Sequence, residues 1–278
     1  MSFFSDISAI QNIVYIFSSI LFISGIKMLG KEDTAVRGNF LSASAMFIAV
    51  AVTIINVVNP VIVLIGVSIG AVIGSLIALR VKMTSIPEMV ALFNGFGGLA
   101  TFFIAWSEFN AIPDNVFQFI VIMLTTYIGG VTFSGSIIAY GKLSEKLKVK
   151  KDSFVTKIFT TFFYASILFL VYSIGFTEII ELPINFYTVL LILTLLGGIG
   201  FVIPIGGGDM PVVISLLNSF SGIAAAFAGL LLLNNVLIVA GSLVGASGLI
   251  LTIIMAKAMN RSIGNILFVG YASSSSSS

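Results

Sequence analysis

The chain of 278 residues contains no cysteine and no histidine, and only 9% of its residues are charged. Without cysteine, disulfides, thiol nucleophiles and cysteine metal sites are excluded. Without histidine, the chain lacks a histidine triad, histidine-ligated metal and the side chain that most often carries protons near neutral pH. Soluble domains carry about 25% charged residues, so the composition excludes a soluble enzyme, a nucleic-acid-binding protein and a disordered chain.

Apolar residues dominate what remains, at 58% of the chain with a mean hydropathy of +1.18. A hydrocarbon core of about 30 Å needs roughly 20 apolar residues per helix. The first such run has no basic segment or cleavage site before it, so we interpret it as a retained helix and not as a signal peptide. The sequence predicts an all-α, polytopic membrane helix bundle with nine transmembrane helices, at residues 10–29, 39–58, 61–79, 86–105, 116–139, 157–175, 186–205, 210–233 and 236–256.

The charges divide between the two sides of the membrane. With nine spans, all 13 basic residues fall on one side, and the other side carries only acidic residues: Asp6, Glu108, Asp114, Glu178 and Glu181. The positive-inside rule therefore predicts an N-terminus outside and a C-terminus in the cytoplasm. The short separators Asn59-Pro60 and Asn234-Asn235 predict two tight hairpins.

Two stretches of the chain align with each other, one beginning at Pro87 and the other 124 residues later at Pro211. Proline, leucine, asparagine, phenylalanine, glycine and alanine coincide in register. Both stretches start on the basic side, which predicts a parallel internal repeat. Sites in membrane proteins with such repeats tend to lie near mid-membrane, between the repeats.

The repeat places Asn94 and Asn218 at matched positions, each seven residues after its proline. At 1.5 Å per residue they lie about 10 Å into the membrane. Asparagine and serine often join helices without further purpose, and this alternative stays open. Together with Ser215, which lies near Asn218, the two asparagines favour a polar path for protons.

The spans carry no Asp, Glu, Lys or Arg at their centres, although a proton pump normally needs an ionisable group within the membrane. Charged candidates lie instead at the basic ends of helices. Asp209 and Glu88 open two spans, where a carboxylate either complements the helix dipole or forms a gate. Arg261 follows the last span as an interfacial anchor or as a coupling residue.

Several glycines recur at small-residue spacing, which is typical of close helix contact. We assign Gly241, Gly245 and Gly248 to helix packing, and we interpret the series Gly66, Gly70 and Gly74 in the same way. The glycines at 197, 198 and 200 lie inside an apolar span, so they do not form a dinucleotide-binding turn.

The longest motif, over residues 209–222, reads Asp-Met-Pro-Val-Val-Ile-Ser-Leu-Leu-Asn-Ser-Phe-Ser-Gly. Together with residues 87–98, 131–142, 241–248 and 257–262, it resembles the membrane domain of the proton-translocating NAD(P) transhydrogenase beta subunit. The resemblance covers most of residues 1–270. It implies a transmembrane proton-translocation domain over 1–270, followed in the family by an NADP(H)-binding domain that this sequence lacks. Residues 271–278 are then a serine-rich tail or a truncation scar.

The resemblance also implies roles for individual residues. Asp209, Asn218 and Arg261 match family positions for proton conduction or its coupling to the nucleotide domain, as do Gly241, Gly245 and Gly248. Asn94 matches a position that is the proton-relay histidine in some members and asparagine in others. Members with asparagine there resemble a class whose relay histidine lies on the partner subunit.

The function implied is inward proton movement coupled to hydride transfer from NADH to NADP in a bacterial inner membrane or the mitochondrial inner membrane. Neither cofactor binds this chain: NADP(H) belongs to the absent domain, and NAD(H) to alpha subunits that also supply transmembrane helices. The resemblance suggests a homodimeric complex, and we expect no nucleic-acid partner and no metal. Two alternatives stay open: a small-solute secondary transporter with its site between the repeats, and a structural scaffold for a larger membrane complex.

Overall fold

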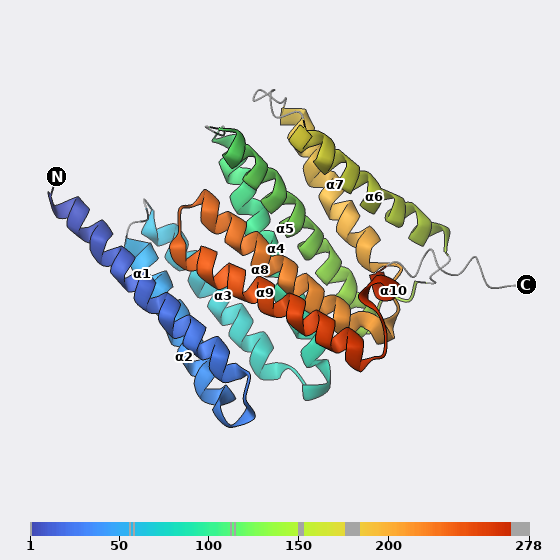
Figure 1. The fold of residues 1–278 in the computed structure, drawn as a ribbon, viewed down its shortest axis with the longest axis horizontal. Helices are drawn as coiled ribbons and strands as arrows, with labels where there is room; N and C mark the ends of the chain where they lie inside the picture. The colour runs from blue at the N-terminus through green and yellow to red at the C-terminus, as the bar shows by residue number, and fades with distance from the viewer. Residues whose placement is uncertain are drawn as a thin grey trace, which may run out of the picture. The chain divides into compact units, whose positions relative to one another are not determined.

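The structure, a computed structural model, describes residues 2–55, 57, 59–111, 113, 115–149, 153–175 and 184–267, and all regular elements in this part are helices (Figure 1). The prediction of an all-α fold is therefore confirmed. The elements are α1 (Ser2–Leu29), α2 (Glu32–Ile55), α3 (Pro60–Arg80), η1 (Met83–Ser85), α4 (Ile86–Asn110), α5 (Val116–Leu143), α6 (Phe154–Gly175), α7 (Ile184–Val202), η2 (Gly207–Asp209), α8 (Met210–Leu231), α9 (Asn235–Ala258) and α10 (Ile263–Leu267).

The long helices have the length and composition of membrane spans. Each predicted apolar run overlaps one helix of the series α1 to α9. Within the described residues, 8 of these helices are long and apolar enough to cross a membrane. The shorter apolar stretch in α7, Phe186–Val202, does not reach that length. The chain is an integral membrane protein, while the count of nine spans, their orientation and the parallel repeat stay predictions.

The chain divides into two compact units, described over 2–82 with 234–240, and over 83–233 with 241–267. In the first unit, α1 and α2 form an antiparallel pair. The hydroxyl groups of Tyr15 and Thr53 lie 2.8 Å apart, and Gln11 donates to the Tyr15 hydroxyl at 2.9 Å. Small residues allow the helices to approach, since a Cβ atom added to Gly38 would lie 2.7 Å from the Gly25 carbonyl oxygen.

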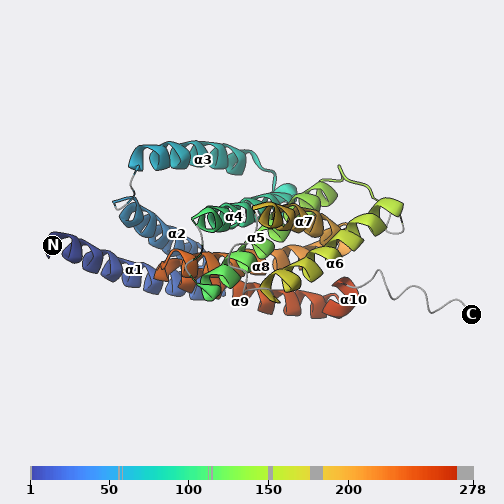
Figure 2. The same cartoon turned by 90° about the horizontal axis from the view of Figure 1, so that it is seen from above.

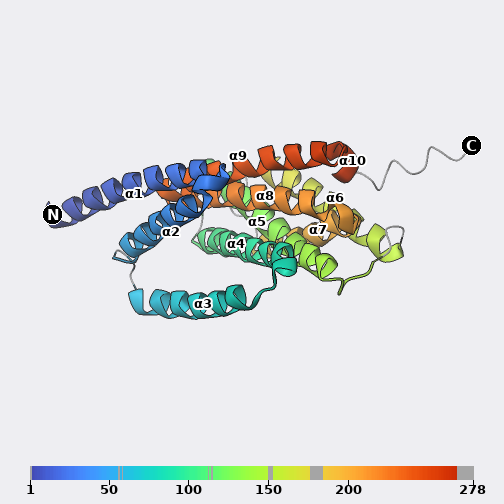
Figure 3. The same ribbon diagram turned by 90° about the horizontal axis from the view of Figure 1, so that it is seen from below.

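Helix α3 belongs to the same unit but makes little contact with its neighbours, and it lies apart from α1 and α2 in two views (Figures 2 and 3). None of its residues is buried. The described residues also place no atom within 4 Å of a Cβ built on Gly66, Gly70 or Gly74. The prediction of helix contact through these glycines is therefore wrong for the described residues of this chain, and the tight hairpin at Asn59-Pro60 stays a prediction. Glycine spacing permits close approach, but it does not supply the partner helix.

The second unit is organised around α5, which packs against α4, α6, α7 and α8. Its glycines explain this central position. A Cβ atom on Gly129 would lie 2.9 Å from the Gly98 carbonyl oxygen of α4, and one on Gly135 would lie 3.1 Å from the Val202 side chain of α7. Larger residues at these positions would force the helices apart.

The core of this unit beside its basic end consists mainly of apolar side chains from α5, α7 and α8, including Val202, Met210 and Leu217, to which α4, α9 and α10 each add one buried residue. Pro87 and Pro211 lie in the first turns of α4 and α8, where a missing backbone N–H costs no helical hydrogen bond. Among the charges that the topology prediction used, Asp114, Glu178, Glu181, Lys150 and Lys151 lie outside the described residues, as does the tail at 271–278.

Candidate functional site

A hydrogen-bonded network connects α4, α5 and α8 at the predicted depth of the two asparagines. The Asn94 amide nitrogen donates to the Ser136 hydroxyl at 3.1 Å, and the Asn94 amide oxygen accepts from the Ser221 hydroxyl at 2.7 Å. Ser221 lies 2.8 Å from the main-chain carbonyl oxygen of Asn218. The structure therefore connects Asn94 to α8 through Ser221, a serine that belongs to neither matched position, and Asn218 takes part only through its main-chain carbonyl, one turn earlier on the same helix. We call Asn94, Ser136, Ser221 and Asn218 the amide network.

Close packing of α4 on α5 fixes this geometry. A Cβ atom on Gly95, the residue after Asn94, would lie only 3.1 Å from the Ser136 Cβ atom. One on Gly98 would lie 2.9 Å from the Thr132 Cβ atom. Asn94 and Ser221 remain half-buried, while Ser136 is fully buried. The network thus has one side embedded in protein and one side that is accessible.

A second polar cluster lies between α8 and α9, and it contains Ser215. The Ser215 hydroxyl lies 3.2 Å from the Gly248 carbonyl oxygen and accepts from Thr252 at 3.1 Å. Ser219 donates to the Gly245 carbonyl at 2.6 Å. Ser215 is predicted on one path with the two asparagines, and its hydrogen bonds link α8 to α9.

The three glycines that we assigned to packing line this contact. Cβ atoms on Gly241 or Gly245 would meet Ala226 and Ile223 of α8, and one on Gly248 would lie 2.9 Å from both the Cα and the Cβ atoms of Ser219. In the other direction, a Cβ atom on Gly222 would lie 2.8 Å from the Gly245 Cα atom. Backbones at this separation allow serine hydroxyl groups to reach carbonyl oxygens of the neighbouring helix.

The structure pairs Asp209 with Arg261 at the basic end of the same unit. The Arg261 Nη1 atom donates to the Asp209 Oδ2 atom at 2.7 Å, and the side chains are 52% and 11% exposed. Asp209 occupies the N-cap position of α8 but makes no side-chain cap hydrogen bond. The carboxylate therefore forms an ion pair and no cap hydrogen bond, at a position where its charge also complements the dipole of α8.

The end of α9 explains how Arg261 reaches Asp209. Asn260 has a left-handed backbone with φ of 54°. The Arg261 N–H donates back to the Ala256 carbonyl at 3.0 Å, and the Asn260 N–H to the Lys257 carbonyl at 2.9 Å. This is the hydrogen-bond pattern of a Schellman ending, in which asparagine is the commonest substitute for glycine. The turn reverses the chain and directs Arg261 toward the start of α8.

Sequence reasoning missed Lys142, at the end of α5. Its ammonium group donates to three main-chain carbonyls, those of Val202 at 3.2 Å, Ile203 at 2.5 Å and Ile205 at 2.6 Å. The only available signal was a lysine in the last turn of a span, which is also typical of an interfacial anchor. Glu88 lies half-buried in the first turn of α4, and it is not part of the Asp209–Arg261 pair.

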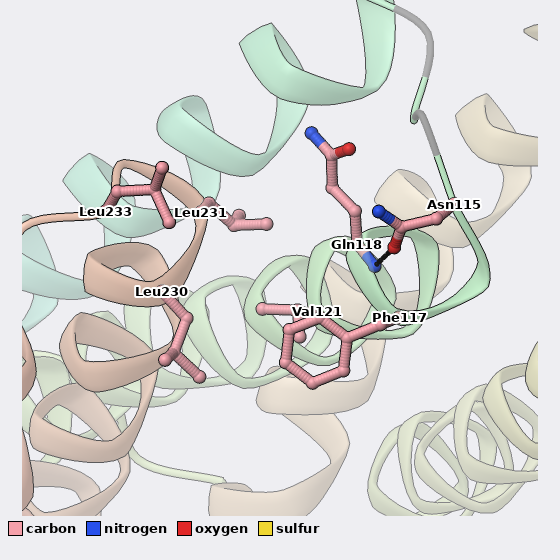
Figure 4. Close-up of a pocket in the computed structure, with 7 residues that line it drawn as sticks. All are labelled: Asn115, Phe117, Gln118, Val121, Leu230, Leu231 and Leu233. Carbon is pink, nitrogen blue, oxygen red and sulfur yellow. Dashed lines mark hydrogen bonds between the residues drawn. The ribbon is translucent and has the colours of Figure 1, made fainter.

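A pocket of about 330 Å³ lies between the start of α5 and the end of α8 (Figure 4). Asn115 lines it and caps α5, because its side-chain oxygen accepts from the Gln118 N–H at 2.8 Å. The other lining residues are Phe117, Val121, Leu230, Leu231 and Leu233. This largely apolar lining contains amides but no charged side chain, so it offers no site for an ionic substrate.

The site can relay hydrogen bonds. A hydroxyl group both donates and accepts a hydrogen bond, while a side-chain amide donates through its nitrogen and accepts through its oxygen. The side chains of the site do not titrate near neutral pH. Within the described residues, no group of three or more Asp or Glu side chains is arranged to hold a metal ion. The arrangement therefore fits the transfer of protons or water better than covalent chemistry.

Comparison with known proteins matches residues 11–278 to the family of the NAD(P) transhydrogenase beta subunit. Two curated relatives, both NAD(P) transhydrogenase subunit beta from Rhodospirillum rubrum, one of them from a specified strain, are each 37% identical over 271 residues. The match covers 93% of this chain and 58% of each relative, so the chain spans about three-fifths of their length. The chain belongs to the NAD(P) transhydrogenase beta subunit family.

Proposed function

We propose that the chain is the membrane part of a proton-translocating NAD(P) transhydrogenase, in which inward proton movement drives hydride transfer from NADH to NADP. Membership of the family supports this proposal, and so does the amide network that joins three apolar helices. Hydride transfer itself takes place in nucleotide-binding parts of the complex, outside the described residues. This chain accordingly binds neither cofactor in its membrane part.

The energy of a proton suffices for this reaction. A proton that crosses a membrane at about 150–200 mV releases roughly 3.5–4.5 kcal/mol. Since 1.4 kcal/mol is a factor of ten, this shifts a product ratio by about a thousandfold. Hydride exchange between two nicotinamide nucleotides is nearly isoenergetic, so the proton sets its direction.

We assign the amide network to the proton path and the Asp209–Arg261 pair to coupling. Asn94 and Ser221 present hydrogen-bonding atoms from two helices, and Ser136 fixes the Asn94 amide from a third. The titrating group of the path belongs to a transmembrane helix of an alpha subunit, since this chain has no histidine. Ser215 acts in the α8–α9 contact, and Glu88 acts as a second acidic group at the start of α4.

The proposal places all nine helices α1 to α9 across the membrane, including the shorter α7. The N-terminus then lies outside, and the Asp209–Arg261 end lies in the cytoplasm. The positive-inside distribution of the lysines and arginines supports this orientation. The NADP(H)-binding domain then contacts the cytoplasmic end, and protonation changes of the alpha-subunit group beside the amide network reach it through the ion pair. The partners are alpha subunits and a second copy of the complex.

The test uses everted membrane vesicles that contain the complete complex. Hydride transfer from NADPH to an NAD analogue is followed by absorbance, and internal acidification by a fluorescent pH indicator. The proposal predicts acidification that requires both nucleotides. Hydride transfer without acidification would contradict the proton role.

A small-solute transporter remains the alternative class, and the repeat was its main support. The pocket between α5 and α8 lies at the helix ends and not at the depth of the amide network, and a second pocket, lined by Lys142 and Lys148 among others, lies at the basic helix ends. Solute uptake by proteoliposomes that hold this chain alone, without nucleotides, would favour that alternative.

A further inference from the structure

We infer that Lys142 is a positioning residue that fastens the loop between α7 and α8 to α5 and so keeps Asp209 beside Arg261. This inference deepens the proposed function, because it names the physical link between the amide network and the ion pair. The link runs along α5, an element that carries no residue of the ion pair itself.

The ammonium group of Lys142 is fully engaged. A lysine has three N–H donors, and all three find carbonyl acceptors at 2.5–3.2 Å on Val202, Ile203 and Ile205. These carbonyls end α7 and begin the loop. A cation at the carbonyl end of a helix is also favoured by the helix dipole. The contact therefore fixes where α7 ends and in which direction the chain leaves it.

The rest of the loop has few other attachments. Cβ atoms built on Gly206, Gly207 or Gly208 would find no atom within 4 Å in the described structure, and all three glycines are exposed. The stretch is therefore held at its ends. Lys142 and the buried side chain of Ile205 hold one end, and the Asp209–Arg261 pair holds the other.

Helix α5 connects this loop to the amide network. Ser136, which accepts the hydrogen bond from Asn94, precedes Lys142 by six residues on the same helix, or about 9 Å along its axis. Between them, Ala139 is fully buried in the core that α5 shares with α7 and α8. A shift or rotation of α5 that starts at Asn94 and Ser136 therefore moves Lys142, and the three carbonyls move with it.

Spin-label distance measurements on the full chain test the positioning role without reference to activity. Because the chain has no native cysteine, labels at Gly207→Cys and Ser262→Cys report only the loop and the end of α9. Lys142→Met keeps an unbranched side chain, one atom shorter, and removes the charge and the donors. Lys157→Met is the matched control, because Lys157 is exposed at the start of α6 and its ammonium group makes no hydrogen bond to the loop in the described structure.

We expect a narrow distance distribution in the background and in Lys157→Met. In Lys142→Met we expect the population of molecules with a displaced loop, relative to that with the original loop position, to rise by about tenfold. This corresponds to about 1.4 kcal/mol. Identical distributions in all three proteins would overturn the positioning role, whether or not the complex translocates protons.

The link to coupling is tested in the complete complex by the ratio of acidification to hydride transfer. We expect Lys142→Met and Asp209→Asn each to lower this ratio, and the double variant to be no worse than either one, because both act through the same contact. Additive losses, or an unchanged ratio in Lys142→Met, would overturn the link. A wild-type complex with hydride transfer but no acidification would refute the proposed function instead, while the distance measurement still decides the positioning role.

Discussion

The contact between α8 and α9 has little tolerance for added volume, which allows a quantitative prediction for Gly248→Ala. The new methyl group would lie 2.9 Å from the Cα, Cβ and N atoms of Ser219. Carbon atoms pack at about 3.5–4.0 Å, so the helices must separate by about 0.6–1.1 Å. The obstruction includes backbone atoms, so a side-chain rotation cannot relieve it.

Separation of this size also breaks hydrogen bonds. The Ser215 hydroxyl lies 3.2 Å from the Gly248 carbonyl oxygen, so a shift of about 0.6–1.1 Å takes it beyond hydrogen-bonding distance. Overpacking of a filled contact costs about 1–3 kcal/mol. We therefore expect Gly248→Ala to lower the free energy of unfolding by about that amount.

Thermal unfolding in detergent, monitored by tryptophan fluorescence or circular dichroism, measures the effect. The matched control is Gly70→Ala, since the described residues leave open space around a Cβ at Gly70. Both substitutions gain the same intrinsic helix propensity, so their difference isolates the contact. Equal midpoints for the two variants would refute the steric reasoning.

Three further substitutions test other parts of the structure. Asp209→Asn should lower the free energy of unfolding by about 1.5 kcal/mol, the lower end for a hydrogen bond to a charged group, because Arg261 is 52% exposed. Its effect on the unfolding midpoint should shrink in high salt, and a salt-independent effect would argue against an ion pair. Asn260→Gly should leave the unfolding midpoint nearly unchanged, whereas Asn260→Val should lower the free energy of unfolding by about 1–2 kcal/mol, because valine opposes the left-handed backbone. Equal unfolding midpoints for these two variants would contradict this expectation. Tyr187→Phe should lower stability by about 1–3 kcal/mol, because it leaves the buried Thr126 hydroxyl without its 2.7 Å partner, and an unchanged midpoint would show that this bond contributes nothing.

The helices could be predicted from the sequence because apolar runs of span length have few alternatives in a chain with so little charge. Prolines and asparagines at the run boundaries located the turns, and Asn234 indeed caps α9 by accepting from the Leu237 N–H at 3.0 Å. Spacing could not predict which helices touch. The glycines at 66, 70 and 74 have the same pattern as those at 241 and 245, yet only the second series lies against another helix.

The candidate site was predicted in part. Matched positions in the two stretches singled out Asn94 and Asn218, but the side chain of α8 that bonds the Asn94 amide is Ser221, three residues after Asn218. The contacts of Lys142 could not be foreseen, because main-chain carbonyls 60 or more residues away leave no trace in side-chain patterns. Asp209 and Arg261 were both candidates, but their pairing depends on the backbone reversal at Asn260.

The central claim, that the amide network carries the coupled proton, is tested most directly by two alanine substitutions on the same helix. Asn94→Ala removes the amide that joins Ser136 and Ser221, whereas Asn110→Ala removes an exposed amide that only bonds the Trp106 carbonyl of its own helix. In everted vesicles with the complete complex, we expect Asn94→Ala to abolish acidification driven by NADPH and an NAD analogue, and Asn110→Ala to leave it intact. Full acidification in Asn94→Ala, at the wild-type ratio to hydride transfer, would contradict the account.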